Sequence, residues 1–279
     1  MPQSFNPDGR VIVVTGAGSG IGRALAVQAA VGGARAVVAC DIDQGAAQET
    51  ADLLPVGDHH AIGVDVRDET AVAATIAHIE ERIGPVDLWC SNAGVHRGDG
   101  LGADADWDTS LDVHLRAHVY LARHLIPRMA DRGQGWLLIS ASAAGLLSDI
   151  GSAPYTASKH AAVGFAEWLS INYDTSGITV SCLCPQGVKT GMNMGRRDGS
   201  TGSGDSYLEP GKVAADAFEA LQTGLFLILP HPDVASYERR RSQDRERWLA
   251  GMRRLSKALN SARALHADRR EHRDDTADC

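Results

Sequence analysis

Tyr155 and Lys159 stand four residues apart in the segment Tyr-Thr-Ala-Ser-Lys, a spacing that places both side chains on one face of a helix. A free phenol has a pKa of about 10, and an ammonium group one turn away favours its ionised form. Such a pair can exchange protons with a bound molecule near neutral pH. Taken alone, however, the spacing is more often a partly buried tyrosine beside a solvated lysine, so other residues must indicate a site.

A glycine-rich turn at residues 15–22, Thr-Gly-Ala-Gly-Ser-Gly-Ile-Gly, follows a short apolar run and precedes a helical pattern. Glycine lets the backbone approach a pyrophosphate closely, and the N-terminal amides of the following helix favour the phosphate charge. Gly16, Gly20 and Gly22 meet this need. Because the turn lies between a strand and a helix, a dinucleotide site is favoured over a tight turn without a ligand.

The chain around these residues alternates between strand and helix patterns. The predicted strands are residues 10–16, 34–41, 59–66, 86–94, 135–142, 178–185 and 225–230. The predicted helices are residues 20–33, 43–54, 69–83, 106–132, 153–174 and 211–223. This alternation predicts an α/β fold, a Rossmann-type doubly wound parallel sheet of about seven strands with helices on both faces.

Polar or small residues stand at several carboxyl ends of the predicted strands, where open α/β sheets bind ligands. Asp41 ends the second strand, where its carboxylate would accept hydrogen bonds from the adenosine ribose and repel a 2′-phosphate. The sequence therefore favours NAD(H) over NADP(H), and a capping role for Asp41 at the next helix is compatible with this. Asp65 and Val66 close the third strand, where a carboxylate can meet the adenine amino group. Small residues at 92–94, Asn-Ala-Gly, close the fourth.

With these motifs the sequence resembles a short-chain dehydrogenase/reductase of the common single-domain branch. The resemblance covers residues 9–230, and the chain after residue 230 lies outside it. It rests on motifs in a specific order and spacing: the turn at 15–22, Asp65 with Val66, residues 92–94, Ser142, and Tyr155 with Lys159.

The resemblance implies an enzyme that moves a hydride between a nicotinamide cofactor and an alcohol or ketone. Tyr155 would be the general acid/base, Lys159 would favour its ionised form and hold the nicotinamide ribose, and Ser142 would hydrogen-bond the substrate oxygen. The resemblance also implies a set of cofactor-contacting residues: Gly16, Ser19, Gly20, Ile21, Gly22, Asp41, Ile42, Asp65, Val66, Asn92, Ala93, Gly94, Tyr155, Lys159, Pro185, Gly187, Val188 and Thr190.

The sequence departs from the family pattern at two places. Residues 113–115 are Val-His-Leu where the family usually has Val-Asn-Leu, so His114 either replaces that asparagine in a water-linked proton path to Lys159 or only packs the helix. In the first case, a histidine that titrates at about pH 6–7 would add an acidic limb to the oxidation rate. After the sixth strand, residues 185–187 are Pro-Gln-Gly, with the usual glycine displaced by one, and we expect Gln186 to reach the mouth of the site.

Composition limits the partners and the location. The net charge of −8 argues against non-specific nucleic-acid binding, and no apolar stretch approaches the roughly 18 residues of a membrane span. The N-terminus lacks the pattern of a signal peptide, and the five cysteines show neither metal nor disulfide spacing, so we expect a protein of the reducing cytoplasm. The resemblance implies a homotetramer or homodimer, with residues 106–132 and 153–174 pairing with their symmetry mates.

We expect one oxidoreductase domain over residues 1–232, including a mobile loop at 190–210 that covers the substrate. Residues 233–279 are predicted to be a charged, mostly helical extension with a disordered end. Positions 238–273 carry twelve Lys/Arg against five Asp/Glu, and apolar residues recur there at helical spacing. Packing against its own or a neighbouring subunit is favoured over a membrane-surface or partner-binding role.

The leading interpretation is an NAD-dependent oxidoreductase of secondary alcohols or ketones. An NADP-dependent carbonyl reductase is the alternative that Asp41 disfavours. A non-catalytic dinucleotide sensor is disfavoured because a sensor has no need of Ser142, Tyr155 and Lys159 together. Four apolar residues favour a hydrophobic substrate: Trp107, Leu146, Leu147 and Met192.

Overall fold

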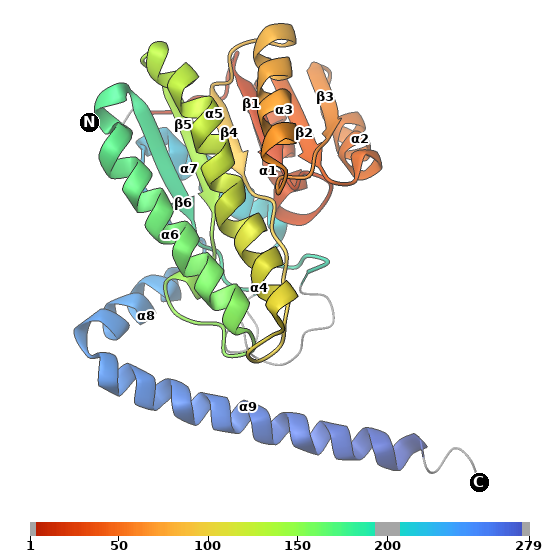
Figure 1. The fold of residues 1–279 in the computed structure, drawn as a ribbon, viewed down its shortest axis with the longest axis vertical. Coiled ribbons are helices and arrows are strands. Elements are labelled where there is room, and N and C mark those ends of the chain that lie inside the picture. Colours follow the sequence, from red (N-terminus) through yellow and green to blue (C-terminus); the bar gives the residue numbers. More distant parts are fainter. Residues whose placement is uncertain (1–3, 193–206, 275–279) are drawn as a thin grey trace.

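The protein is described by a computed structural model that covers residues 4–192 and 207–274, with side chains described up to residue 261. A parallel sheet of seven strands in the order β3-β2-β1-β4-β5-β6-β7 forms its centre (Figure 1). The strands are β1 (Val11–Thr15), β2 (Ala36–Asp41), β3 (Asp58–Gly63), β4 (Leu88–Ser91), β5 (Gly135–Ser140), β6 (Ile178–Leu183) and β7 (Leu227–Ile228). The predicted fold class is confirmed.

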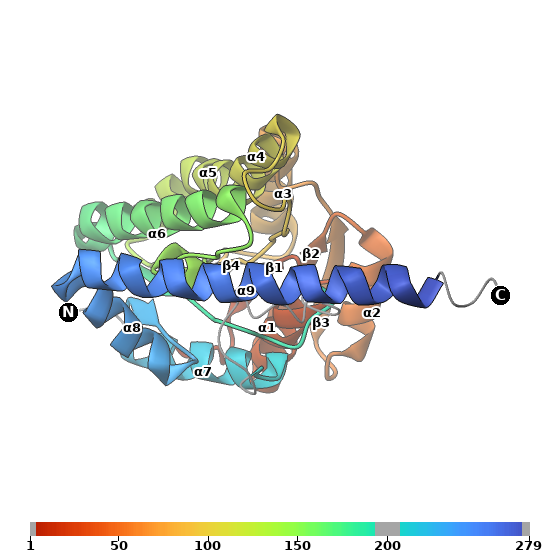
Figure 2. The ribbon, with the colours of Figure 1, turned by 90° about the horizontal axis from the view of Figure 1, so that it is seen from below.

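Helices cover both faces of this sheet (Figure 2). One face carries α1 (Gly20–Val31), α2 (Gln44–Leu53) and α7 (Pro210–Thr223). The other carries α3 (Glu69–Arg82), α5 (Ala117–Asp131) and α6 (Ala153–Tyr173), with α4 (Asp104–Leu111) leading into α5. The chain is therefore doubly wound, with one apolar core on each side of the sheet.

Strand β1 shows why the apolar runs predicted central strands. Val11 and Val13 belong to the core under α3, α5 and α6, whereas Ile12 and Val14 belong to the core under α1 and α7. Successive side chains of a strand point to opposite faces, so a strand covered on both sides must be apolar throughout.

Several predicted strands, although not the second, were too long at their carboxyl ends. β3 ends at Gly63 and β4 at Ser91, so Asp65 and Asn92 lie in the loops just beyond the strands and not within them. The backbone leaves the ladder there because other partners take its amides: the Asn92 amide donates to Thr15 Oγ1 at 3.0 Å. These residues nevertheless stand at the carboxyl edge of the sheet, where the sequence placed them.

The single helix predicted over residues 106–132 is interrupted. A π-helical turn, Asp112–Arg116, separates α4 from α5. Such turns are common at functional sites because the extra residue re-aims the side chains around it. Apolar spacing along the sequence does not reveal the turn, which carries His114 with its partners Val95 and Ser158 from distant segments.

The C-terminal extension consists of α8 (Pro232–Gln243) and α9 (Arg245–Asp274). Val234 at the start of α8 is buried in the core, whereas α9 passes below the domain in the view of Figure 1. The sequence predicts a disordered end, but helix α9 continues to Asp274. Residues 275–279 lie outside the described residues. Most of the predicted substrate loop, residues 193–206, also lies outside them. Within the described residues, none of the helices has the length and apolar character needed to span a membrane.

Candidate active site

A cavity of about 470 Å³ lies at the carboxyl edge of the sheet, where the strand order reverses between β1 and β4. Open α/β sheets bind their ligands at this point. Nearly all the predicted site residues line it: Gly16, Ser19, Gly20, Ile21, Gly22, Asp41, Ile42, Asp65, Val66, Asn92, Ala93, Gly94, His114, Ser142, Tyr155, Lys159, Pro185, Val188 and Thr190. Gly187 is the exception, and its carbonyl oxygen lies 3.0 Å from His231 Nε2.

The turn between β1 and α1 has the shape that a pyrophosphate requires. Gly16 adopts a φ of +65°, which side chains rarely permit, and a Cβ on Gly22 would collide with the carbonyl oxygen of Gly16. Helix α1 begins behind Ser19, whose side chain makes no capping hydrogen bond. The first amides of α1 therefore remain available to an anion in the cavity.

Asp41 at the end of β2 presents a fixed carboxylate to the cavity. Its Oδ2 accepts a hydrogen bond from the Gly18 amide at 2.8 Å, and its Oδ1 accepts one from the Asp43 amide at 3.1 Å. A Cβ on Gly18 would lie 2.9 Å from Oδ2, so only glycine allows this approach. The absence of a side chain at Gly18 in the glycine-rich turn thus makes room for the Asp41 carboxylate.

Asp65 is paired more tightly than the sequence indicated. The Arg67 guanidinium donates to both of its carboxylate oxygens, at 2.6 to 3.1 Å. The hydrogen bonds from Arg67 hold the pKa of Asp65 below its usual value. Sequence reasoning considered the carboxylate alone and missed Arg67, which also lines the cavity. An adenine amino group would have to share Asp65 with this arginine.

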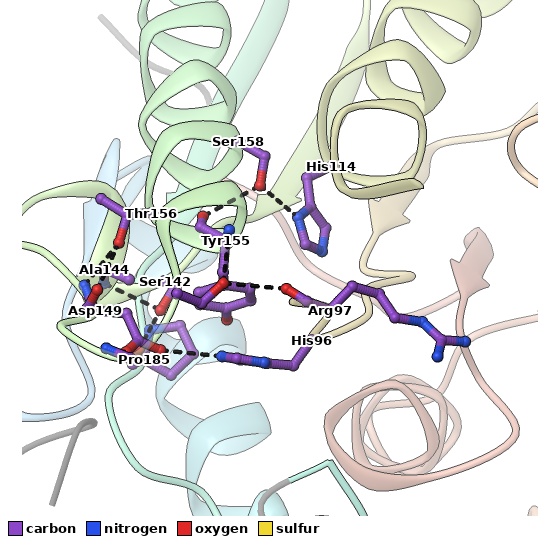
Figure 3. Close-up of polar contacts among 12 residues, drawn as sticks. His96, Arg97, His114, Ser142, Ala144, Asp149, Tyr155, Thr156, Ser158 and Pro185 are labelled. Carbon is purple, nitrogen blue, oxygen red and sulfur yellow. Dashed lines mark hydrogen bonds and ion pairs between the residues drawn. The ribbon is translucent and has the colours of Figure 1, made fainter. Parts of the chain in front are cut away.

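Tyr155 and Lys159 lie near the start of α6 and share one wall of the cavity with Ser142. Figure 3 shows Ser142 beside Tyr155. Lys159 Nζ is 5.8 Å from the centre of the Tyr155 ring and donates to the carbonyl oxygen of Ser140 at 3.0 Å. The Ser142 hydroxyl oxygen accepts from the Ala144 amide at 3.1 Å. The structure therefore brings the three predicted catalytic groups of α6 and the β5 loop together.

Burial of Lys159 lowers the pKa of its ammonium group to about 8. The neighbouring Cys184 and Cys182 act in the opposite direction and are the smaller influence. A desolvated ammonium group is stabilised strongly by any acceptor placed beside it. An ionised phenol or the hydroxyl groups of a bound ribose are acceptors of this kind.

His114 lies on the π-helical turn and is fully buried. Its Nε2 accepts from the Val95 amide at 3.1 Å, and its Nδ1 donates to Ser158 Oγ at 2.8 Å. Ser158 Oγ in turn donates to the carbonyl oxygen of Tyr155 at 3.1 Å. This network assigns a neutral ring protonated at Nδ1.

The surroundings of His114 favour the packing alternative over the one that adds an acidic limb to the oxidation rate. Burial, followed by the charges of Lys159 and His118, lowers the pKa of His114 well below its ordinary value, so the ring stays neutral at about pH 6–7. Both ring nitrogens are also occupied by protein groups. The described contacts connect His114 to Tyr155 through Ser158 and not to Lys159.

The four apolar residues expected around the substrate are mostly elsewhere. Met192 lines the cavity, whereas Leu146 and Leu147 lie in the core and Trp107 donates its Nε1 to a backbone carbonyl. Leu146 and Leu147 follow Ser142 closely in the sequence, but the short turn after β5 directs both side chains into the core. The cavity wall therefore does not by itself favour a hydrophobic substrate. Gln186 lines the cavity, as expected.

Several lining residues were missed by sequence reasoning: Val64, Arg67, Val95, Arg97, Thr109, Val113, Ser140, Ala141 and Gly191. For Val95 and Arg97 a signal existed, because they directly follow the small residues at 92–94. A further pair, His96 and Asp149, was also missed and lies beside Tyr155 (Figure 3). His96 also follows the small residues at 92–94. Its pairing with Asp149, 53 positions later, depends on the tertiary fold and leaves no pattern in the sequence.

Comparison with known protein families gives a match over residues 10–201 to the family described as short chain dehydrogenase. The chain is similar to 1-deoxy-11-beta-hydroxypentalenate dehydrogenase of Streptomyces avermitilis, with 34% identity over 231 residues that cover 80% of this chain and 84% of the relative. It is also similar to meso-2,3-butanediol dehydrogenase of Serratia marcescens, with 33% identity over 190 residues that cover 67% and 75% of the two chains.

Among solved structures, the chain is similar to a short chain dehydrogenase/reductase from Burkholderia phymatum in complex with NAD. The two share 31% sequence identity and a TM-score of 0.75, and the match covers 87% of this chain and 96% of the other.

Proposed function

The chain belongs to the short chain dehydrogenase family and is an oxidoreductase of alcohol or ketone substrates, and on that premise we propose that it uses NAD(H) to interconvert a secondary alcohol and its ketone. One observation carries the proposal: Ser142, Tyr155 and Lys159 share a wall of the cavity that also holds the glycine-rich turn. The complex of the Burkholderia phymatum protein with NAD supports the choice of cofactor.

In this proposal a bound nicotinamide supplies or accepts the hydride, and the protein's own groups do the rest. Tyr155 takes the hydroxyl proton of the alcohol in oxidation and returns a proton to the carbonyl oxygen in reduction. Ser142 donates a hydrogen bond to that oxygen and orients it. The Lys159 ammonium favours the ionised form of Tyr155 and binds the nicotinamide ribose.

His114 has a positioning role in this scheme. Through Ser158 it supports the first turn of α6, from which Tyr155 projects. Its neutral ring adds no second positive charge beside Lys159.

A turnover assay distinguishes an enzyme from a non-catalytic dinucleotide sensor. We expect NADH to form when the protein is mixed with NAD and members of a panel of secondary alcohols, and the burst and steady-state rates give the turnover directly. A protein that binds NADH but oxidises no member of the panel, and reduces none of the matching ketones, would favour a dinucleotide sensor.

Asp41 is expected to determine the choice between NAD and NADP. Its fixed carboxylate accepts hydrogen bonds from ribose hydroxyls and repels a 2′-phosphate. In Asp41→Ala, the ratio of kcat/KM for NAD to that for NADP should fall by about 100-fold, through weaker NAD use and new NADP use. Asp43→Ala is the matched control, because Asp43 caps α2 and does not line the cavity. A wild-type protein that already uses NADP as well as NAD would contradict the assignment.

We also propose a cytoplasmic protein that forms a homodimer or homotetramer. Trp168 and Ile171 support an interface on α6, because both are more than half exposed on one helix. Large apolar groups on a soluble surface are typical of contact sites, and homo-oligomers usually pair such faces by symmetry.

A further inference from the structure

A histidine–aspartate pair is buried beside the cavity but outside its lining. His96 Nε2 lies 3.1 Å from Asp149 Oδ2, and the two side chains are 7% and 2% exposed. The other carboxylate oxygen, Oδ1, accepts from the Gly151 amide at 2.7 Å. Burial of polar groups such as these is tolerated when they are hydrogen-bonded, and here the imidazole and the Gly151 amide both bond to the carboxylate.

The pair contacts Tyr155 through its histidine. The His96 ring stacks on the Tyr155 ring with 4.6 Å between centres and an angle of 26° between planes (Figure 3). The His114 ring meets Tyr155 edge-on at 5.5 Å and 88°. One histidine therefore fixes the face of the phenol ring and the other its edge, which leaves few positions for the hydroxyl group.

Asp149 is in turn fixed to the same helix that carries Tyr155. Its backbone amide donates to Thr156 Oγ1 at 2.9 Å, and the Thr156 hydroxyl contacts the Asp149 carbonyl oxygen at 3.0 Å. The loop of His96 is attached as well, since Ser152 Oγ accepts from the Tyr155 amide at 3.2 Å and donates to the Arg97 carbonyl oxygen at 3.1 Å. The loop after β4 and the start of α6 thus form one unit around the phenol.

We propose that the His96–Asp149 pair is a positioning device for Tyr155. Asp149 orients the imidazole, and the imidazole holds the phenol ring at the angle that proton transfer requires. The proposal rests on the proposed function of Tyr155 as acid/base. It assigns neither His96 nor Asp149 a contact with the substrate or cofactor.

Four variants of the full-length enzyme test the device. In His96→Ala and Asp149→Ala, kcat for the alcohol should fall about 10- to 100-fold, the loss typical of a misplaced reacting group, while KM and the Kd of NADH change less than about threefold. The solvent deuterium isotope effect on kcat should rise, because proton transfer becomes slower. Asp149→Asn should restore most of the rate, since its amide can hydrogen-bond both the Gly151 amide and a neutral His96. His124→Ala is the control, because His124 pairs with Glu69 at 3.0 Å on the surface.

Adding His96→Ala to the Tyr155→Phe variant tests the positioning role of His96 separately from the acid/base role of Tyr155. If His96 acts through the phenol hydroxyl, His96→Ala should lower the residual rate of Tyr155→Phe by less than about twofold. A loss as large as in the wild-type background would overturn the proposal, as would a kcat of His96→Ala within twofold of wild type. If Tyr155→Phe itself keeps full turnover, the acid/base assignment fails instead. Should His96→Ala not fold, Asp149→Asn against Asp149→Ala makes the same comparison, and equal rates in those two overturn it.

Discussion

Tyr155→Phe is expected to lower kcat by about 10²- to 10⁴-fold, the range for loss of a general acid/base, with NADH affinity close to that of wild type. The structure explains why the loss should be confined to the chemical step. A phenylalanine ring keeps the stack on His96 and the edge contact with His114, and it leaves Lys159 bonded to the Ser140 carbonyl oxygen. Only the hydroxyl group that moves the proton is removed.

Steady-state kinetics measure kcat of Tyr155→Phe, and titration with NADH measures its affinity for the cofactor. Tyr173→Phe is the matched control, because Tyr173 ends the same helix and packs against Trp168 away from the cavity. The Tyr173→Phe variant should keep kcat within about twofold of wild type, because Tyr173 does not line the cavity and changes outside functional features usually have small effects. A Tyr155→Phe enzyme that turns over within tenfold of wild type would contradict the acid/base role.

The part of the site that could be predicted is the part encoded locally. Strand β1 had to be apolar because both its faces are covered, and Gly16 and Gly22 had to be glycine because a backbone turn and a close approach exclude a side chain. Tyr155 and Lys159 needed only helical spacing to share a wall. In each case the physical cause lies within a few residues of its effect.

The missed features depend on partners from distant segments. The π-helical turn carries His114, which bonds to Val95 in the loop after β4 and to Ser158 on α6. The pair of His96 and Asp149 likewise joins two loops. His114 departs from the family pattern and His96 follows residues 92–94, but neither signal identifies the distant partner of the histidine.

The expectation that Leu146 and Leu147 lie beside the substrate differs from the structure for a related reason. Leu146 and Leu147 follow Ser142 closely, but the short turn there sends both into the core under α6. Apolar character near a catalytic residue is compatible with a pocket wall and with core packing. Only the direction of the side chain distinguishes the two, and that direction is set by the backbone of the turn.

Two neutral histidines behind the site are expected to make folding stability strongly dependent on acid. His118 is one helical turn after His114, has an exposed fraction of 1%, and has its Nδ1 2.7 Å from Ser91 Oγ. Its Nε2 has no hydrogen-bond partner among the described residues. Burial, assisted by the charge of Lys159, lowers the pKa of His118 to about 3, and burial also lowers that of His114.

The sign of the effect follows from the proton balance. In the unfolded chain a histidine takes up a proton at a pH of about 6.5, whereas these two rings stay neutral in the folded state until the pH is far lower. The unfolded state therefore binds more protons below this pH, and the free energy of unfolding falls as the pH is lowered. For His118 the slope approaches about 1.4 kcal/mol per pH unit at the limit, and the contribution lost between pH 6.5 and 4.5 is about 2 kcal/mol, because the unfolded ring is only half protonated at pH 6.5.

Urea unfolding at a series of pH values measures this slope, and His118→Gln isolates the share of one ring. Glutamine keeps a neutral polar group for Ser91 but cannot take up the proton, so the variant should lose about half of the histidine contribution between pH 6.5 and 4.5. The exposed His78 on α3 provides the control His78→Gln, which should show the wild-type slope. Carboxylates that titrate in the same range affect all three proteins alike and cancel in the comparison. If His118→Gln and wild type lose stability equally as the pH falls, the folded protein accepts a proton at His118 as readily as the unfolded chain. The ring would then be charged beside Lys159 in mild acid, which its burial without an acceptor at Nε2 opposes.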